Sequence, residues 1–188
     1  MFDLERFVGS CLDASRSDDP PATARRILSE VIADRASIAA ALGQARTPSD
    51  MASQYRFLYQ SPELTILHVI VPPNFRSPPH NHLVWVAIGM YEGCEKHTFY
   101  RKQEGQLVEE GVRDVMAPDV ITLASDSIHG IENPLGRPSH ALHVYGGSLA
   151  NSARSIWNPY TLQEEPFQLA ALAQYEAEMN DRLTGDAT

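Results

Sequence analysis

The chain has 188 residues and a formal net charge of −9 at pH 7, with 43% hydrophobic and 21% charged residues. This length and composition predict an ordinary globular chain, folded as a single domain over residues 1–188. The negative charge argues against nucleic acid and against an anionic membrane as partners, because both attract a basic surface.

Two further features bear on the cellular compartment. The longest apolar runs, such as Leu83–Met90, are far too short to span a bilayer, and the N-terminal residues lack the pattern of a secretory signal. Cys11 and Cys94 have neither metal-ligand nor CxxC spacing. We therefore expect a cytoplasmic protein without a disulfide framework.

Residues 1–50 are expected to form a helical N-terminal segment. Apolar residues recur at helical spacing from Phe2 to Leu12. Asp19 stands before two prolines, a pattern that predicts the N-cap of a second helix. We expect this second helix to end at Gly43.

From about residue 53 the pattern changes to short strands. Residues 64–71 (LTILHVIV) are rich in β-branched side chains, and Pro72-Pro73-Asn74 ends that run. Six to eight such strands, separated by turns over about 95 residues, predict an antiparallel barrel or a double-sheet roll. We therefore expect a mainly β fold with a barrel over 51–150, preceded by helices and followed by an extension with a helix over 151–188.

His80 and His82 open one of the predicted strands. Alternate residues on a strand face the same side, roughly 6.6 Å apart, so both imidazoles can reach one ion at about 2.1 Å. The same parity runs through Val84 to Met90, which predicts an apolar face lining the barrel. The alternative is a chance pair of histidines on a solvent-facing strand.

His129 is the candidate for a third ligand. It follows a strand and a polar turn in APDVITLASDSIHGIEN, and a barrel that folds back would bring it beside the other two histidines. Three imidazoles leave coordination positions open on the ion, which favours catalysis over a closed structural site.

These residues carry a resemblance to a known family. PPHNH, the glycine of YEG and DSIHGIEN resemble the two motifs of the cupin superfamily, and the closer resemblance is to bacterial cysteine-dioxygenase-like thiol dioxygenases. The resemblance covers about residues 51–147. It implies a double-stranded β-helix (jelly-roll) barrel and a non-heme Fe(II) centre held by His80, His82 and His129, although three imidazoles also suit Zn, Ni or Cu.

One departure from the general cupin pattern separates these families. Cupins usually place a glutamate ligand four or five residues after the second histidine, where this chain has Val86 and Ala87. Thiol dioxygenases also lack that ligand. A neutral ligand set leaves Fe(II) its full double charge, so that an anionic thiolate can bind beside O2.

The resemblance also implies roles for His143 and Tyr145. In thiol dioxygenases a Ser-x-His-x-Tyr strand points the tyrosine hydroxyl at the bound substrate, and the histidine orients it. His143 and Tyr145 match the last two members, whereas Ala141 occupies the serine position. The alternative is a core histidine and a core tyrosine bonded to backbone groups.

Arg56 is the candidate substrate-binding residue. In the cysteine-specific members an arginine at about this place clamps the substrate carboxylate through a planar bidentate contact. The alternative is a solvated surface arginine. Among the other histidines, His68 and His140 are expected to be structural, and His97 either approaches the cavity or bonds on a neighbouring strand.

The resulting hypothesis is an Fe(II) dioxygenase that oxidises a small thiol, such as cysteine or a mercapto acid, to its sulfinic acid with O2. Another metal-dependent cupin reaction, for example carbon–carbon cleavage or isomerisation, would use the same three histidines without Arg56 or Tyr145. A third possibility is a non-catalytic cupin that binds a metal or a small ligand.

Overall fold

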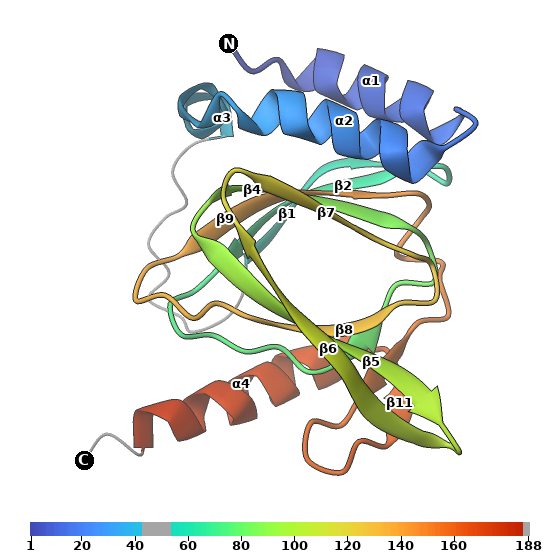
Figure 1. The fold of residues 1–188 in the computed structure, drawn as a ribbon, viewed down its shortest axis with the longest axis vertical. Coiled ribbons are helices and arrows are strands. Elements are labelled where there is room, and N and C mark those ends of the chain that lie inside the picture. The colour runs from blue at the N-terminus through green and yellow to red at the C-terminus, as the bar shows by residue number, and fades with distance from the viewer. Residues whose placement is uncertain (43–53, 186–188) are drawn as a thin grey trace.

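The structure, a computed structural model, describes residues 1–42 and 54–185. Two antiparallel sheets face each other and form a barrel, with helices on both outer sides (Figure 1). This is the mainly β fold with helices at both ends that the sequence predicts.

Three helices precede the barrel: α1 (Leu4–Ser15), α2 (Pro20–Ile32) and α3 (Arg35–Leu42). As predicted, Asp19 caps α2, because its side chain accepts a hydrogen bond from the Ala22 N–H at 3.2 Å. The prediction that this helix continues to Gly43 is wrong. Asp34 instead accepts a hydrogen bond from the Ser37 N–H at 3.1 Å and so begins a separate helix. Gly43 lies outside the described residues.

Within the described ranges, the two sheets are built from eleven strands. The first contains, in spatial order, β1 (Gln54–Gln60), β2 (Thr65–Val71), β9 (Ser139–Tyr145), β4 (Val86–Glu92) and β7 (Asp119–Leu123). The second contains β11 (Glu164–Pro166), β10 (Ser155–Trp157), β3 (His80–Asn81), β8 (Ile128–Glu132), β5 (Cys94–Gln103) and β6 (Gln106–Met116). The eight strands β2 to β9 lie in the orders β2-β9-β4-β7 and β3-β8-β5-β6. This is the strand order of a jelly roll, or double-stranded β-helix.

Strand alternation divides the apolar residues between two cores. Val86 and Ile88 on β4 belong to the cluster inside the barrel, whereas Ala87 between them belongs to the cluster beneath the helices. In that second cluster Leu28 and Ile32 of α2 are buried against the outer face of the first sheet. The N-terminal helices therefore cover one sheet and leave the barrel interior to strand side chains.

The stretch from His80 to Met90 is not the single strand that the sequence predicts. β3 ends at Asn81, Leu83 adopts a left-handed conformation with φ of 55°, and β4 begins at Val86 in the other sheet. The chain therefore turns a corner of the barrel between the histidines and the apolar run. The predicted inward face survives the corner, because Val86 and Met90 both lie in the barrel cluster.

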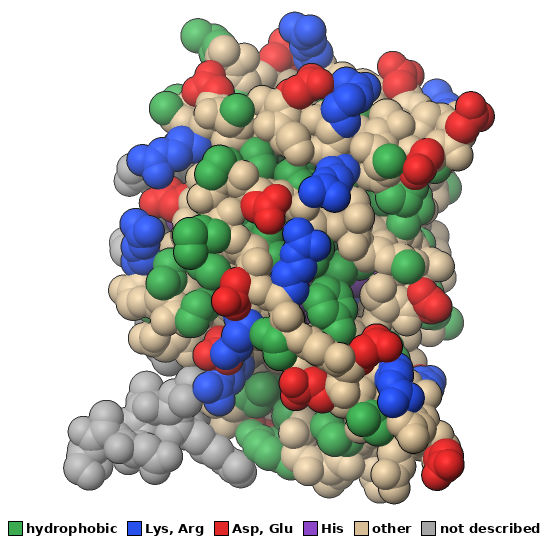
Figure 2. All heavy atoms as spheres, viewed as in Figure 1, with side chains coloured by type: hydrophobic (Ala, Val, Ile, Leu, Met, Phe, Trp, Pro, Cys, Tyr) green, Lys and Arg blue, Asp and Glu red, His purple; other side chains and the backbone are tan. Residues whose placement is uncertain are grey.

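The predicted C-terminal helix is α4 (Leu169–Gly185), which lies on the side of the barrel opposite α1 and α2 (Figure 1). Its Leu172 and Tyr175 pack with Ile156 of β10. On the face drawn in Figure 2, acidic and basic side chains are interspersed around hydrophobic ones at the centre. None of the helices in the described ranges is long and apolar enough to cross a membrane.

Candidate metal and substrate site

Three histidines converge inside the barrel, as the sequence predicts. His80 of β3 stands directly opposite His129 of β8, and His82 follows β3 by one residue. The Nε2 atoms of His82 and His129 are 3.1 Å apart, and the candidate ligand atoms of all three residues lie within 4.8 Å of one another. Two nitrogens that share an ion at about 2.1 Å stand about 3 Å apart when they meet it at a right angle. The spacing thus fits a common metal ion.

Burial keeps these three imidazoles neutral. It lowers the pKa of His80 to about 4, against an opposing effect of the hydrogen bond that Nδ1–H donates to the Pro78 carbonyl at 3.0 Å. Burial and the neighbouring imidazoles also lower the pKa values of His82 and His129 well below the usual range. A neutral imidazole is the form that ligates a metal, and the bond to Pro78 leaves the His80 Nε2 free for that purpose.

A pocket of about 430 Å³ opens onto His80 and His82. Arg154 contributes a charged side chain to its lining, and Tyr145 contributes a phenolic hydroxyl on the side of the histidines. The remaining lining is largely apolar and comes from β1, the segment after β9 and the start of α4: Tyr55, Phe57, Leu149, Ala150, Ser152, Phe167, Leu169 and Leu172. A ligand in this pocket therefore meets a mixed surface, polar on the barrel side and apolar on the other.

His143 and Tyr145 share one face of β9, as expected from strand parity. The Tyr145 hydroxyl lies 2.9 Å from Nδ1 of His143, and its ring packs 5.1 Å, centroid to centroid, from the ring of His82. Burial raises the pKa of Tyr145, so its hydroxyl keeps its proton at neutral pH. Ala141, the departure from the serine of the family pattern, belongs to the apolar barrel cluster.

The prediction that Arg56 lies at the substrate site is wrong about its position. Arg56 pairs with His68 across β1 and β2, and its guanidinium donates a hydrogen bond to the Leu42 carbonyl at 2.9 Å. Because side chains alternate along β1, its neighbours Tyr55 and Phe57 line the pocket instead. Arg56 thus connects the barrel to the helical layer.

Arg154 is the pocket cation that sequence reasoning missed. Its guanidinium carbon lies 3.8 Å from the centre of the Phe167 ring, and its buried Nε has no hydrogen-bond partner. Its charge contributes to lowering the pKa values of His80 and His82. A lone arginine in the segment between β9 and β10 carries no sequence signal that separates it from a surface arginine.

Of the remaining histidines, His68 and His140 lie on the helix side of the first sheet, and His97 lies beside His129. His68 faces the helices, where its Nε2 lies 2.6 Å from the Tyr91 hydroxyl, and His140 Nδ1 lies 3.4 Å from that same hydroxyl. Both are structural, as predicted. His97 is fully buried on β5, with Nδ1 at 3.1 Å from Nδ1 of His129. It contacts a candidate ligand from outside the pocket, so both expectations for it hold in part.

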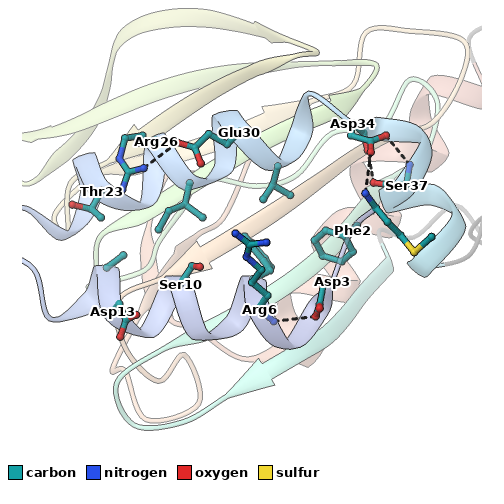
Figure 3. A pocket seen from close by; sticks show the side chains of 15 residues that line it. Phe2, Asp3, Arg6, Ser10, Asp13, Thr23, Arg26, Glu30, Asp34 and Ser37 are labelled. Carbon is teal, nitrogen blue, oxygen red and sulfur yellow. Dashed lines mark hydrogen bonds and ion pairs between the residues drawn. The ribbon is translucent and has the colours of Figure 1, made fainter.

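A groove of about 640 Å³ between α1 and α2 lies apart from the histidines (Figure 3). Some of its charged groups pair with one another. Arg26 pairs with Glu30 at 3.0 Å, and Asp34 bonds to Ser37 and lies 3.7 Å from the amino group of Met1. The residues that line the groove include none of the three candidate metal ligands, and the candidate chemistry stays with the histidine pocket.

No protein-family model matches the chain, and neither does any curated protein. Matching solved structures include a protein with a double-stranded β-helix domain from Klebsiella pneumoniae, 14% identical over 58% of this chain and 82% of that chain, with a TM-score of 0.48. An RmlC-like cupin family protein from Methanocaldococcus jannaschii is 13% identical over 57% and 96% of the two chains, with a TM-score of 0.44. An oxalate oxidase in complex with glycolate is 15% identical over 56% of each chain, with a TM-score of 0.45. The strand order of the barrel, and not these distant likenesses, is what assigns this chain the double-stranded β-helix fold.

Proposed function

We propose that the chain is a non-heme Fe(II) thiol dioxygenase that oxidises a small thiol carrying a carboxylate to its sulfinic acid with O2. The observation that carries the proposal is one pocket lined by His80, His82, Tyr145 and the guanidinium of Arg154, whose buried Nε has no hydrogen-bond partner. His129, which does not line the pocket itself, would be the third ligand.

The donor set supports an anionic substrate. Among the described residues, the group that could hold a metal consists of three histidines without a carboxylate, and all three imidazoles are held neutral by burial. Val86 and Ala87, where cupins usually carry a glutamate ligand, lie in apolar clusters. Bound Fe(II) would supply a double positive charge and open positions for thiolate and O2, and Zn, Ni or Cu would fit the same donors.

Two side chains would position the substrate. Arg154 would take the carboxylate through charge-assisted hydrogen bonds, because its Nε is buried without a partner and its guanidinium is held against Phe167. Tyr145 keeps its hydroxyl proton and can donate it in a hydrogen bond to the bound thiolate or oxygen, while His143 holds the hydroxyl in place. Both oxygen atoms of O2 enter the sulfinate, and the thiol loses one proton.

The ligand set is tested by His82→Ala, with His140→Ala as control. We expect His82→Ala to lose iron binding after anaerobic loading and to lose thiol-dependent O2 uptake in an oxygen electrode with cysteine and 3-mercaptopropionate. His140 bonds to Tyr91 outside the pocket, so its substitution should leave the iron content unchanged.

Three outcomes would overturn the proposal. Full turnover by an iron-loaded His82→Ala variant would remove His82 from the ligand set. Metal binding by the unsubstituted chain without O2 uptake on any small thiol would favour a binding protein. O2 uptake with a diketone but not with thiols would indicate a carbon–carbon cleaving oxygenase instead.

A further inference from the structure

A line of buried polar groups runs from His129 away from the pocket. Nδ1 of His129 lies 3.1 Å from Nδ1 of His97, and Nε2 of His97 lies 3.6 Å from Oε2 of Glu95. The other carboxylate oxygen of Glu95 accepts a hydrogen bond from the Ser139 hydroxyl at 2.8 Å. Glu95, His97 and Ser139 are all completely inaccessible to solvent. The carboxylate is thus held in place at one end of a line that ends at a candidate metal ligand.

The order of protons along this line follows from its two ends. Nε2 of His129 faces Nε2 of His82, and if both ligate one metal ion each needs a free lone pair there, which puts the proton of the neutral His129 ring on Nδ1. That N–H can donate only if Nδ1 of His97 accepts, which places the His97 proton on Nε2. An ionised carboxylate only accepts, and Glu95 lies on that side of His97. Each contact along the line then has one donor and one acceptor.

We propose that Glu95 and His97 are positioning residues that fix the proton of His129 on Nδ1 and so reserve its Nε2 for a metal ion. This inference rests on the metal site of the proposed function. Carboxylate–histidine–metal arrangements are a common way to orient a ligand and raise its basicity. Here a second histidine is inserted between the carboxylate and the ligand.

Two observations favour an ionised Glu95 with a directed role. Oε2 of Glu95 and Nε2 of His97 are both buried without a hydrogen-bond partner, and they face each other just beyond hydrogen-bond length. Burial raises the pKa of Glu95, but interactions with His97, His143 and Ser139 outweigh that effect and lower it. A buried charge without a compensating partner would strongly destabilise the fold.

The test uses substitutions that change which atoms of the line donate and accept hydrogen bonds but keep a side chain of similar size. In Glu95→Gln the new amide can donate to Nε2 of His97, which reverses the tautomer and sets two N–H groups against each other at His129. We expect metal affinity, measured for Zn²⁺ or Fe²⁺ by competition with a chelator, to fall about 10- to 100-fold. Glu176→Gln is the matched control, because Glu176 is a buried carboxylate on α4 bonded to Tyr55 and is expected to leave the affinity unchanged.

Two substitutions of His97 distinguish a loss of hydrogen bonding from a loss of packing. In His97→Gln the amide carbonyl can accept from His129 while the amide nitrogen donates to Glu95, so most of the affinity should return. His97→Leu retains the bulk but accepts nothing, and should lose about as much affinity as Glu95→Gln. This pair keeps the inference testable even if the Glu95 variant does not fold.

Nitrogen NMR of the metal-free protein reads the tautomer directly. We expect the His129 proton on Nδ1 in the unsubstituted chain and in His97→Gln, and a mixture of tautomers in Glu95→Gln. Unchanged affinity and an unchanged tautomer in Glu95→Gln, or equal affinities of the two His97 variants, would overturn the inference. A failure of the unsubstituted chain to bind any metal would instead defeat the proposed function.

Discussion

Arg154 and the three convergent histidines differ in charge. Burial strips the histidines of charge, whereas a guanidinium stays protonated at any pH at which proteins fold. Arg154 therefore brings a fixed positive charge to a pocket whose other walls are largely apolar. A hydrogen bond to a charged group contributes about 1.5–3 kcal/mol, so in the proposed function Arg154 would be the main determinant of binding for an anionic substrate.

Substitution of Arg154 by Met should therefore raise KM for a thiol that carries a carboxylate. Loss of about 1.5–3 kcal/mol corresponds to a rise of about 10- to 150-fold for 3-mercaptopropionate. Cysteamine, which lacks the carboxylate, provides the internal control and should show little change. Oxygen-electrode kinetics at several concentrations of each thiol measure the difference. An equal loss for both thiols would show that Arg154 supports the pocket without contacting the carboxylate.

The residues of the site differ in how far the sequence predicts them. His80, His82, His143 and Tyr145 lie in short i, i+2 patterns, and local strand geometry decides which way such pairs face. Arg154 enters the pocket through the path of the segment between β9 and β10, which no local pattern specifies. For the same reason the sequence could not indicate that Arg56 points toward the helical layer rather than toward the histidines.

At the scale of elements, the end of β9 connects the packing of the barrel to its chemistry. The Gly146 N–H, one residue after Tyr145, donates a hydrogen bond to the Trp85 carbonyl at 3.0 Å. A Cβ atom on Gly146 would overlap the indole nitrogen of Trp85. Trp85 lies at the corner just before β4, so the glycine lets β9 and this corner approach closely.

Gly146→Ala should consequently destabilise the protein and displace Tyr145. Overpacking of this kind typically costs 1–3 kcal/mol, roughly, in the free energy of unfolding. Gly111→Ala on β6 is the control, because a Cβ there meets no atom within 4 Å. Urea denaturation measures the stability of both variants. Equal midpoints for the two variants would mean that Trp85 moves aside without cost.

The corner before β4 also shows where element prediction fails. Alternating apolar residues from Val84 to Met90 predict the inward face correctly. They carry no information on the change of sheet, because the residue with positive φ is Leu83, rather than the glycine or asparagine that usually indicates such a turn. Helix ends follow the same rule. Asp19 is recognised as a cap from its prolines, whereas Asp34 is hidden inside an uninterrupted helical pattern.

Across the whole molecule, buried histidines dominate the dependence of stability on pH. Burial lowers the pKa values of His68, His80 and His143 to about 4, below an unfolded value near 6.5. Between these values the unfolded chain binds more protons than the folded chain, so stability falls as the pH falls. Each histidine accounts for up to roughly 3 kcal/mol. Glu176, with its pKa raised by burial to about 7, acts in the opposite direction and offsets about one of them.

We therefore expect the metal-free protein to lose several kcal/mol of unfolding free energy as the pH falls from about 6.5 to about 4.5. Urea denaturation at a series of pH values, in the presence of a chelator, measures this loss. His68→Gln should reduce the slope, because His68 is remote from the candidate ligands. A stability that stays constant or rises over this range would contradict the expectation.

The pocket is lined by residues from the barrel strands and by residues from the chain after β9. His80 and Tyr145 come from β3 and β9, whereas Arg154, Phe167 and the start of α4 come from the chain after β9, which also supplies β10 and β11 of the second sheet. In the proposed function, many of the side chains that would select the thiol therefore come from a different part of the chain than the candidate metal ligands. Redesign of the substrate preference of the proposed enzyme would therefore start with pocket residues of this segment, such as Phe167 and Leu169, and would keep β10, which pairs with His80.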